Sequence, residues 1–132
     1  MKNWLVTLVV LTLPIAAYLG LKQNQENQAA YIAQAANNKP SIIKFASPMC
    51  MDCKKLGAEI EPLKPIYNDS INFIEIDATA NDKKTQEQIE MYGVTVVPTL
   101  IFLDENNYNV KKVEGFTPKN KIEEHIKELI NG

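Results

Sequence analysis

The sequence predicts an α/β fold, with a central mixed sheet of four to five strands flanked by helices and a hydrophobic helix ahead of it. Three observations support this prediction. Residues 4–21 are almost entirely apolar, short β-type runs alternate with helical patterns after residue 39, and both cysteines lie together in Cys50-Met51-Asp52-Cys53. The length of 132 residues suits one domain with a short appendage.

The charge composition gives no indication of a nucleic-acid partner. The net charge is -2, and every basic residue is a lysine. The chain therefore lacks both a basic surplus and arginine, the side chain that grips phosphate with two parallel hydrogen bonds. The five glycines are scattered, so no glycine-rich phosphate-binding loop is present in the sequence.

The apolar run from Trp4 to Leu21 predicts a membrane anchor. Lys2 and Lys22 flank the run, whose length is close to the roughly 20 residues that a spanning helix needs. A secretory signal peptide has a similar layout, but the run lacks a good cleavage site of small residues. We favour an uncleaved signal-anchor or transmembrane segment over residues 1–22; a cleaved signal and a buried core helix are the alternatives.

Residues 23–38 are predicted to be a polar linker that passes into a first helix. The first half of this segment is rich in Gln and Asn, and the second half, 29–36, contains good helix formers. Pro40 ends the helical pattern, because proline disfavours helix in the residue before it. The remaining residues, 39–132, make up the predicted domain.

The predicted domain opens with a strand over 41–46, a short β-type run that follows a turn signal. A helix then begins near Cys50 and continues to Ile60. Pro62 and Pro65 kink or segment this helix, since proline removes a hydrogen bond and clashes with the preceding turn.

A second strand is predicted over 71–76, and a second helix follows it. Asn81 or Asp82 can cap the start of that helix, which continues to Met91. Gly93 ends it, since glycine is the common residue just past a helix C-terminus.

The last third of the domain predicts a hairpin and a closing helix. Strands over 99–103 and 110–114 are separated by the turn residues 104–107. The helix over 118–130 follows them. Its apolar residues repeat at helical spacing and share one face: Ile122, Ile126, Leu129 and Ile130.

The cysteine pair is the candidate active site. With no third cysteine, the pair is either a working dithiol or part of a metal site. A helix N-terminus stabilises a thiolate through its free N–H groups and its dipole. We therefore expect Cys50, at the helix start, to be the attacking thiolate, and the more sheltered Cys53 to resolve the mixed disulfide.

Three other interpretations of the pair remain open from the residues alone. Two buried structural cysteines are unusual at a helix start. A zinc site needs about four ligands, and the chain offers two cysteines and one distant histidine. A Cu(I) site is a stronger alternative than a zinc site, because Met49 and Met51 add soft sulfur ligands beside the two thiols.

A proline downstream makes the dithiol interpretation more specific. Pro98 lies in Val94-Thr95-Val96-Val97-Pro98-Thr99, directly before a strand. With this feature, residues 39–130 resemble the thioredoxin family. The resemblance implies a thioredoxin fold, no cofactor beyond the redox-active disulfide, a cis Pro98 beside the dithiol, and Val97, Pro98 and Met51 as substrate-binding residues. An ordinary trans proline at a strand start is the alternative.

A narrower resemblance indicates the subfamily. Lys39-Pro40-Ser41 leading into the strand is similar to membrane-anchored thioredoxin-like proteins of cyanobacteria and plastids. Asp77 to Asp82 and Val113 to Phe116 resemble the C-terminal domain of the thiol:disulfide interchange protein DsbD. These resemblances imply a domain on the periplasmic or lumenal side of a membrane, a DsbD- or CcdA-type membrane electron donor, and disulfide-containing clients, including those of cytochrome c biogenesis.

Two positions depart from the family pattern. Met49 stands where a tryptophan usually precedes the first cysteine, and Lys44 stands where a buried acid usually helps to deprotonate the second. A lysine favours thiolates by Coulomb attraction but accepts no proton while charged. Glu75 on the neighbouring strand is a candidate partner for Lys44, and Asp52 is a candidate for the acid role. The alternative is that Lys44 reaches the surface.

The sequence therefore predicts a membrane-anchored reductase of protein disulfides outside the cytoplasm, working through Cys50 and Cys53. A protein disulfide oxidant or isomerase is the alternative of the same class, because motif and fold leave the direction of exchange open. A Cu(I) carrier using Cys50, Cys53 and the nearby methionines is the alternative of another class. A redox-inert adaptor that binds peptides near Pro98 is the third alternative.

Overall fold

A computed structural model describes residues 3, 14–18 and 38–132 of the chain. Residues 14–18 are helical and exposed. The predicted anchor over 1–22 lies mostly outside the described residues, and so does nearly all of the predicted linker and helix over 23–38. Within the described ranges, no helix combines the length and the apolar character needed to cross a membrane.

The domain after residue 37 is built on one four-stranded mixed sheet with the strand order β2-β1-β3-β4. Its strands are β1 (Ser41–Ala46), β2 (Asn72–Asp77), β3 (Thr99–Leu103) and β4 (Asn109–Glu114). β1 pairs in parallel with β2 and antiparallel with β3, and β3 pairs antiparallel with β4. The predicted mixed sheet is confirmed, with four strands in the part of the chain described.

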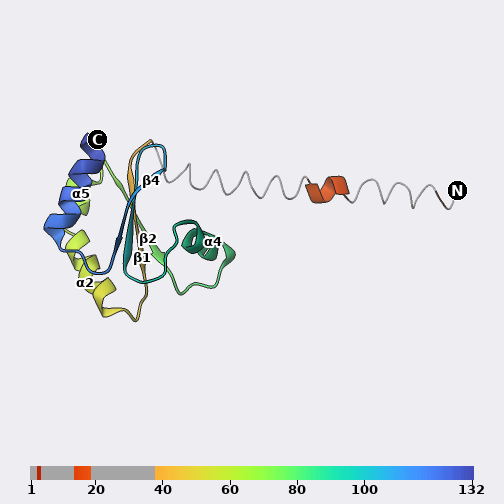
Figure 1. The fold of residues 1–132 in the computed structure, drawn as a ribbon, viewed down its shortest axis with the longest axis horizontal. Helices are drawn as coiled ribbons and strands as arrows, with labels where there is room; N and C mark the ends of the chain where they lie inside the picture. Colours follow the sequence, from red (N-terminus) through yellow and green to blue (C-terminus); the bar gives the residue numbers. More distant parts are fainter. Residues whose placement is uncertain (1–2, 4–13, 19–37) are drawn as a thin grey trace. The chain divides into compact units, whose positions relative to one another are not determined.

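Helices cover both faces of this sheet. They are α2 (Met51–Ile60), α3 (Lys64–Tyr67), α4 (Lys83–Met91) and α5 (Lys119–Asn131). Figure 1 shows α2 and α5 on one side of the sheet and α4 on the other. The break between α2 and α3 lies at the prolines that the sequence predicted would segment this helix, with Pro65 in the first turn of α3.

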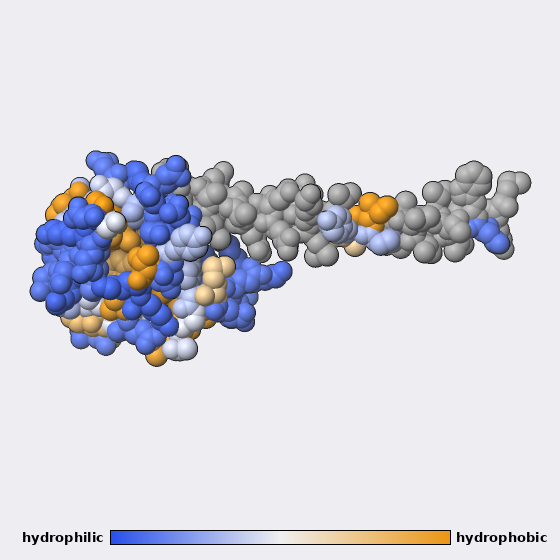
Figure 2. All heavy atoms as spheres, turned by 45° about the horizontal axis from the view of Figure 1, so that its top comes forward, coloured by the Kyte–Doolittle hydropathy of each residue, from blue (hydrophilic) through white to orange (hydrophobic). Residues whose placement is uncertain are grey.

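The two faces of the sheet have separate cores, because neighbouring side chains on a strand point to opposite faces. On the α2/α5 face the buried residues are Ile42, Leu56, Ile60, Leu63, Ile71, Leu100, Phe102, Ile122 and Ile126. On the α4 face they are Ile43, Phe45, Ile101 and Leu103. On the face seen in Figure 2, the surface of this domain is mostly hydrophilic, with apolar residues confined to patches.

The predicted apolar stripe of α5 is buried along most of its length. Ile122 and Ile126 are fully buried, and Leu129 packs against the same core. Ile130, in the last turn, is 41% exposed, because its position lies at the edge of the stripe and beyond the core. The start of α5 is held by α2, since a carboxylate oxygen of Glu59 accepts a hydrogen bond from the Lys119 N–H at 2.6 Å.

Asp82 caps α4 and makes the stability of the domain depend on pH. Its carboxylate accepts hydrogen bonds from the N–H of Thr85 at 3.0 Å and from the Thr85 hydroxyl at 2.8 Å. These bonds, the backbone one first, lower the pKa of Asp82 below its ordinary value. A lowered folded-state pKa means that this stabilisation is present above the unfolded-state pKa and is lost as the pH falls through the folded-state value.

We expect Asp82→Asn to be less stable than wild type at neutral pH, with the difference shrinking as the pH falls below about 4. The reason is that asparagine still caps a helix but has no negative charge to lose. Urea unfolding at a series of pH values measures the difference. Glu105→Gln, which removes a charge from an exposed turn position, is the control for net charge. A difference that stays constant down to pH 2 would contradict the prediction.

Candidate active site

The two cysteines form a disulfide at the start of α2. Cys50 is the N-cap residue of the helix, and Cys53 lies in its first turn, with a Cα–Cα distance of 5.2 Å. Cys50 is half-buried, whereas Cys53 is only 3% exposed. A disulfide-exchange partner can therefore reach the sulfur of Cys50 more readily than that of Cys53.

The helix start supplies a donor for negative charge on Cys50. The backbone N–H of Cys53 donates a hydrogen bond to the Cys50 sulfur at 3.1 Å. A reduced Cys50 in this position would keep that donor and would also feel the positive end of the α2 dipole. Both effects would favour the thiolate over the thiol in the reduced protein.

Pro98 lies directly beside the disulfide. The Val97–Pro98 peptide bond is cis, as the family resemblance implied, and the Val97 carbonyl oxygen is 3.9 Å from the Cys50 sulfur. Pro98 is fully buried at the start of β3. Its carbonyl accepts a hydrogen bond from the Gly115 N–H at 2.8 Å, which ties the segment before β3 to the residues after β4.

The backbone of Val97 is available to a partner. Within the part of the chain that the structure describes, neither the N–H nor the C=O of Val97 has a backbone hydrogen-bond partner. An extended peptide can pair with such free backbone groups as an added strand. The geometry thus places a backbone segment that has no backbone partner next to the sulfur of Cys50.

Exposed apolar side chains border the disulfide and the Pro98 segment. They are Met49 (90% exposed), Met51 (65%), Val96 (48%) and Phe116 (47%), which we call the apolar rim. Each adjoins Cys50, Val97 or Gly115 in the sequence. Val96 and Phe116 are not among the site residues that the sequence predicted. The available signal for Phe116 was its position after Gly115, in the stretch that resembles the DsbD domain.

Two of the three candidate tuning residues meet next to Cys53, and the third does not. Lys44 and Glu75 are register partners on β1 and β2 and form an ion pair at 2.9 Å. The Lys44 side chain is only 11% exposed, so the alternative that it reaches the surface is wrong. Asp52 instead pairs with Lys55 at 3.3 Å on the exposed side of α2, with 59% of its side chain accessible.

An open cleft of about 410 Å³ adjoins Cys53. Its lining comes from β1, the β1–α2 connection, α2 and β2, namely Lys44, Ala46, Ser47, Pro48, Cys53, Lys54, Gly57, Glu75 and Asp77. The side-chain hydroxyl and the N–H of Thr79 both donate to Asp77, which lowers the pKa of that carboxyl. Because the cleft is open and Cys53 is part of its lining, water in the cleft can approach Cys53.

Metal ligands are sparse around the dithiol. Among residues 3, 14–18 and 38–132, no three or more His, Cys, Asp or Glu side chains are grouped so that they could hold a metal ion. The methionines that would complete a Cu(I) site, Met49 and Met51, are both strongly exposed.

Comparison with known proteins places this site in a family. The family model described as thioredoxin matches residues 21–128. The chloroplastic thioredoxin-like protein HCF164 of rice is 25% identical over 86% of this chain, which spans 43% of the length of that relative. A homologue of the thiol:disulfide interchange protein TxlA from Synechocystis is 25% identical, over 98% of this chain and 76% of its own length.

Thioredoxins themselves match a shorter part of the chain. The thioredoxin of Bacillus subtilis is 33% identical over 68% of this chain and 78% of its own length. The crystal structure of the germline-specific thioredoxin Deadhead of Drosophila melanogaster superposes with a TM-score of 0.66, covering 80% of this chain and 94% of its own, at 24% identity. Mitochondrial thioredoxin 3 of Saccharomyces cerevisiae gives a TM-score of 0.63 at 20% identity, covering 76% and 89%. Both solved structures share the fold.

Proposed function

The chain belongs to the thioredoxin family of thiol:disulfide oxidoreductases, whose redox centre is a disulfide without a cofactor, and from this premise we propose that it is a membrane-anchored reductase of protein disulfides outside the cytoplasm. The observation that carries the proposal is the Cys50–Cys53 disulfide at the start of α2, with the unpaired backbone of Val97 beside its more accessible sulfur.

The proposed reaction passes two electrons from the reduced dithiol to a client disulfide. The Cys50 thiolate attacks one client sulfur, so that a mixed disulfide forms and the other client sulfur leaves as a thiolate. Cys53, after losing its proton, attacks Cys50 and releases the second client sulfur. The client thiolates take up protons from water, and the protein is left with the Cys50–Cys53 disulfide that the structure contains.

We propose that clients bind across Val97, Pro98 and Met51. An extended client segment would pair with the free backbone of Val97 as an added strand. The apolar rim would then cover the client residues on either side of the attacked disulfide. Methionine suits such a surface because its side chain is flexible and adapts to differently shaped partners. This binding mode is compatible with many clients rather than with one.

The anchor and the electron donor are the finer parts of the proposal. The apolar run from Trp4 to Leu21 supports a membrane anchor. The resemblance to anchored thioredoxin-like proteins supports a domain on the periplasmic or lumenal side, supplied with electrons by a DsbD- or CcdA-type carrier. A client in cytochrome c biogenesis follows from the same resemblance.

A membrane-impermeant maleimide tests the location of the domain. The maleimide should label reduced Cys50 in intact cells or right-side-out vesicles. Labelling only after lysis would contradict a location outside the cytoplasm.

The reduction potential of the Cys50–Cys53 pair tests the direction of exchange. The full chain in detergent micelles is equilibrated against defined thiol buffers, and the fractions of dithiol and disulfide are measured. We expect a value near that of thioredoxin, about -270 mV, which suits a reductase. A value near that of DsbA, about -120 mV, would make the protein an oxidant. Failure to form the intramolecular disulfide would overturn the exchange function.

A further inference from the structure

Lys44 is a mostly buried lysine on the active-site face of the sheet. By strand alternation it shares the α2/α5 face with Ile42, and it lies across from Leu100 on β3 and Glu75 on β2. Lysine is rarely buried unless its charge is paired. Here Glu75 supplies the partner at 2.9 Å, and that carboxylate is itself 60% exposed. The ion pair thus offsets the desolvation cost of holding the positive charge of Lys44 inside the fold.

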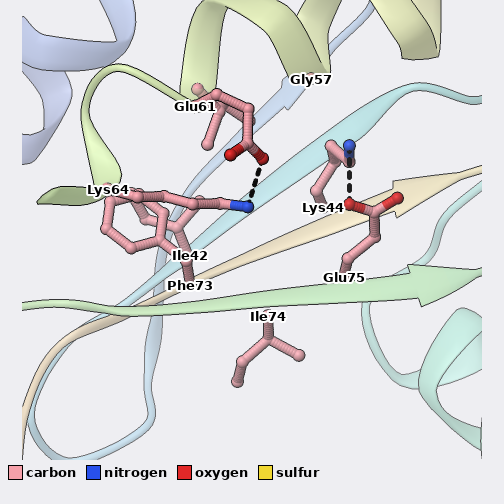
Figure 3. Close-up of a pocket in the computed structure, with 9 residues that line it drawn as sticks. Ile42, Lys44, Gly57, Glu61, Lys64, Phe73, Ile74 and Glu75 are labelled. Carbon is pink, nitrogen blue, oxygen red and sulfur yellow. Dashed lines mark hydrogen bonds and ion pairs between the residues drawn. The ribbon is translucent and has the colours of Figure 1, made fainter. Parts of the chain in front are cut away.

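The ammonium group of Lys44 lies directly against α2. A Cβ atom added to Gly57 would come within 3.3 Å of the Lys44 Nζ, and Figure 3 shows the Lys44 side chain extending from β1 toward the helix at Gly57. Gly57 follows Cys53 by four residues, so the two positions are neighbours on the same face of the helix. Glycine inside a helix is destabilising relative to alanine. At this position it leaves the space that the ammonium group occupies.

Four charged side chains line the same open cleft as Cys53. Lys44 comes from β1, Glu75 and Asp77 from β2, and Lys54 from α2 itself. Glu75, Asp77 and Lys54 are exposed, so water and salt screen their fields. Lys44 is the least exposed of the four and is therefore screened least. The formal charges in the cleft cancel, and the positive charge of Lys44 is the one of the four that water and salt screen least.

We propose that Lys44 is a fixed positive charge that stabilises the thiolate of Cys53 during release of the client. The inference rests on the proposed function. In the mixed disulfide, the Cys53 thiol loses its proton to water in the cleft. The resulting thiolate attacks the Cys50 sulfur, the Cys50–Cys53 bond forms, and the bond between Cys50 and the client breaks. The electron pair leaves with the client sulfur, which takes a proton from water.

Lys44 remains an ammonium ion throughout this step. A buried carboxylate at the same position would act differently, since it would accept the proton of the thiol. In this chain the positive charge of Lys44 beside α2 takes the place of a proton acceptor. The two arrangements predict opposite effects on Cys53 when the side chain on β1 is made neutral. Neutralising a carboxylate that acts as the base would leave the pKa of Cys53 unchanged or lower it. Removing a positive charge would instead raise the pKa of Cys53.

The test is the titration of each cysteine in the reduced full chain, held in detergent micelles and labelled with ¹³C at the cysteine Cβ. Cys50→Ser assigns the two resonances. We expect Lys44→Met to raise the pKa of Cys53, so that the thiolate fraction at a fixed pH below it falls about tenfold. Glu75→Gln should act in the opposite direction, because it leaves the positive charge unopposed. Lys44→Met should still fold, since the exposed Glu75 carboxylate stays hydrated; Lys44→Gln is the second neutral variant.

Lys54→Met is the matched control. It removes the same charge from the same cleft, but from an exposed side chain, and should change the thiolate fraction of Cys53 less than threefold. An unchanged or lowered pKa of Cys53 in both neutral Lys44 variants would overturn the inference, and so would an equal effect of Lys54→Met. These outcomes are separate from failure of the proposed function, which would appear as a wild-type chain that does not reduce client disulfides at all.

Discussion

Replacing Cys53 by alanine should stop the reaction at the mixed disulfide. Cys50 would still attack a client, because the N–H donor at residue 53 and the helix N-terminus stay in place. Release requires a second sulfur within reach of Cys50, and the variant has none. We expect turnover of a disulfide-containing test protein to fall to the uncatalysed background, with a covalent adduct of protein and client accumulating instead. Non-reducing electrophoresis and intact-mass measurement detect this adduct.

Cys50→Ala is the matched control for this experiment. It removes the more accessible sulfur and leaves Cys53, which is only 3% exposed. Turnover should fall to background here as well, but without an adduct. If the Cys53→Ala variant gave no adduct, or if Cys50→Ala gave as much, the assignment of Cys50 as the attacking sulfur would be wrong.

Replacing Leu56 by alanine should cost about 3 kcal/mol of unfolding free energy, within the usual range of about 2–5 kcal/mol for a buried leucine. Leu56 is completely buried in the core between α2, α5 and the sheet. It lies in the helix that carries the dithiol, one turn after Cys53. Since small domains have only about 5–15 kcal/mol in total, this loss is a large share of the stability. Urea unfolding of the oxidised protein measures it.

Met91→Ala controls for truncation of an apolar side chain in a helix. Met91 is the last residue of α4 and is 62% exposed. Its replacement should change the unfolding free energy by no more than about 0.5 kcal/mol. Equal effects of the two substitutions would contradict burial in the α2/α5 core as the cause of the larger loss expected for Leu56→Ala.

The strands show where the sequence was sufficient and where it was not. β1 and β3 occupy the predicted residues, because short β-type runs between turn signals leave little freedom in their bounds. β2 begins at Asn72 rather than at residue 71. Ile71 is buried in the core, but its N–H donates to the carbonyl of Tyr67 instead of to a neighbouring strand. Apolar character indicates burial, whereas membership of a strand depends on the hydrogen-bond partner.

The candidate site also has some features that the sequence predicts and others that only the tertiary structure shows. The pairing of Cys50 with Cys53 and the position of Cys50 at a helix start follow from local spacing, and the motif before β3 indicates the site of the cis peptide bond. The sequence did not predict Val96 and Phe116 as site residues. Their exposure beside the dithiol depends on how the segment before β3 packs against the segment after β4. The exposed position of Asp52 likewise follows from the direction in which α2 presents its first turn.

By itself, the sequence determined the mixed sheet covered by helices, the reactive pair at a helix N-terminus and the proline before a strand, since each depends on residues close together in the chain. Only the tertiary structure decided where the charge of Lys44 lies. Its burial requires Glu75 from the parallel strand and a helix position, Gly57, that has no side chain to exclude the ammonium group. A charge acts on a thiol through distance and screening by water, and both are set by contacts between segments that are far apart in the sequence.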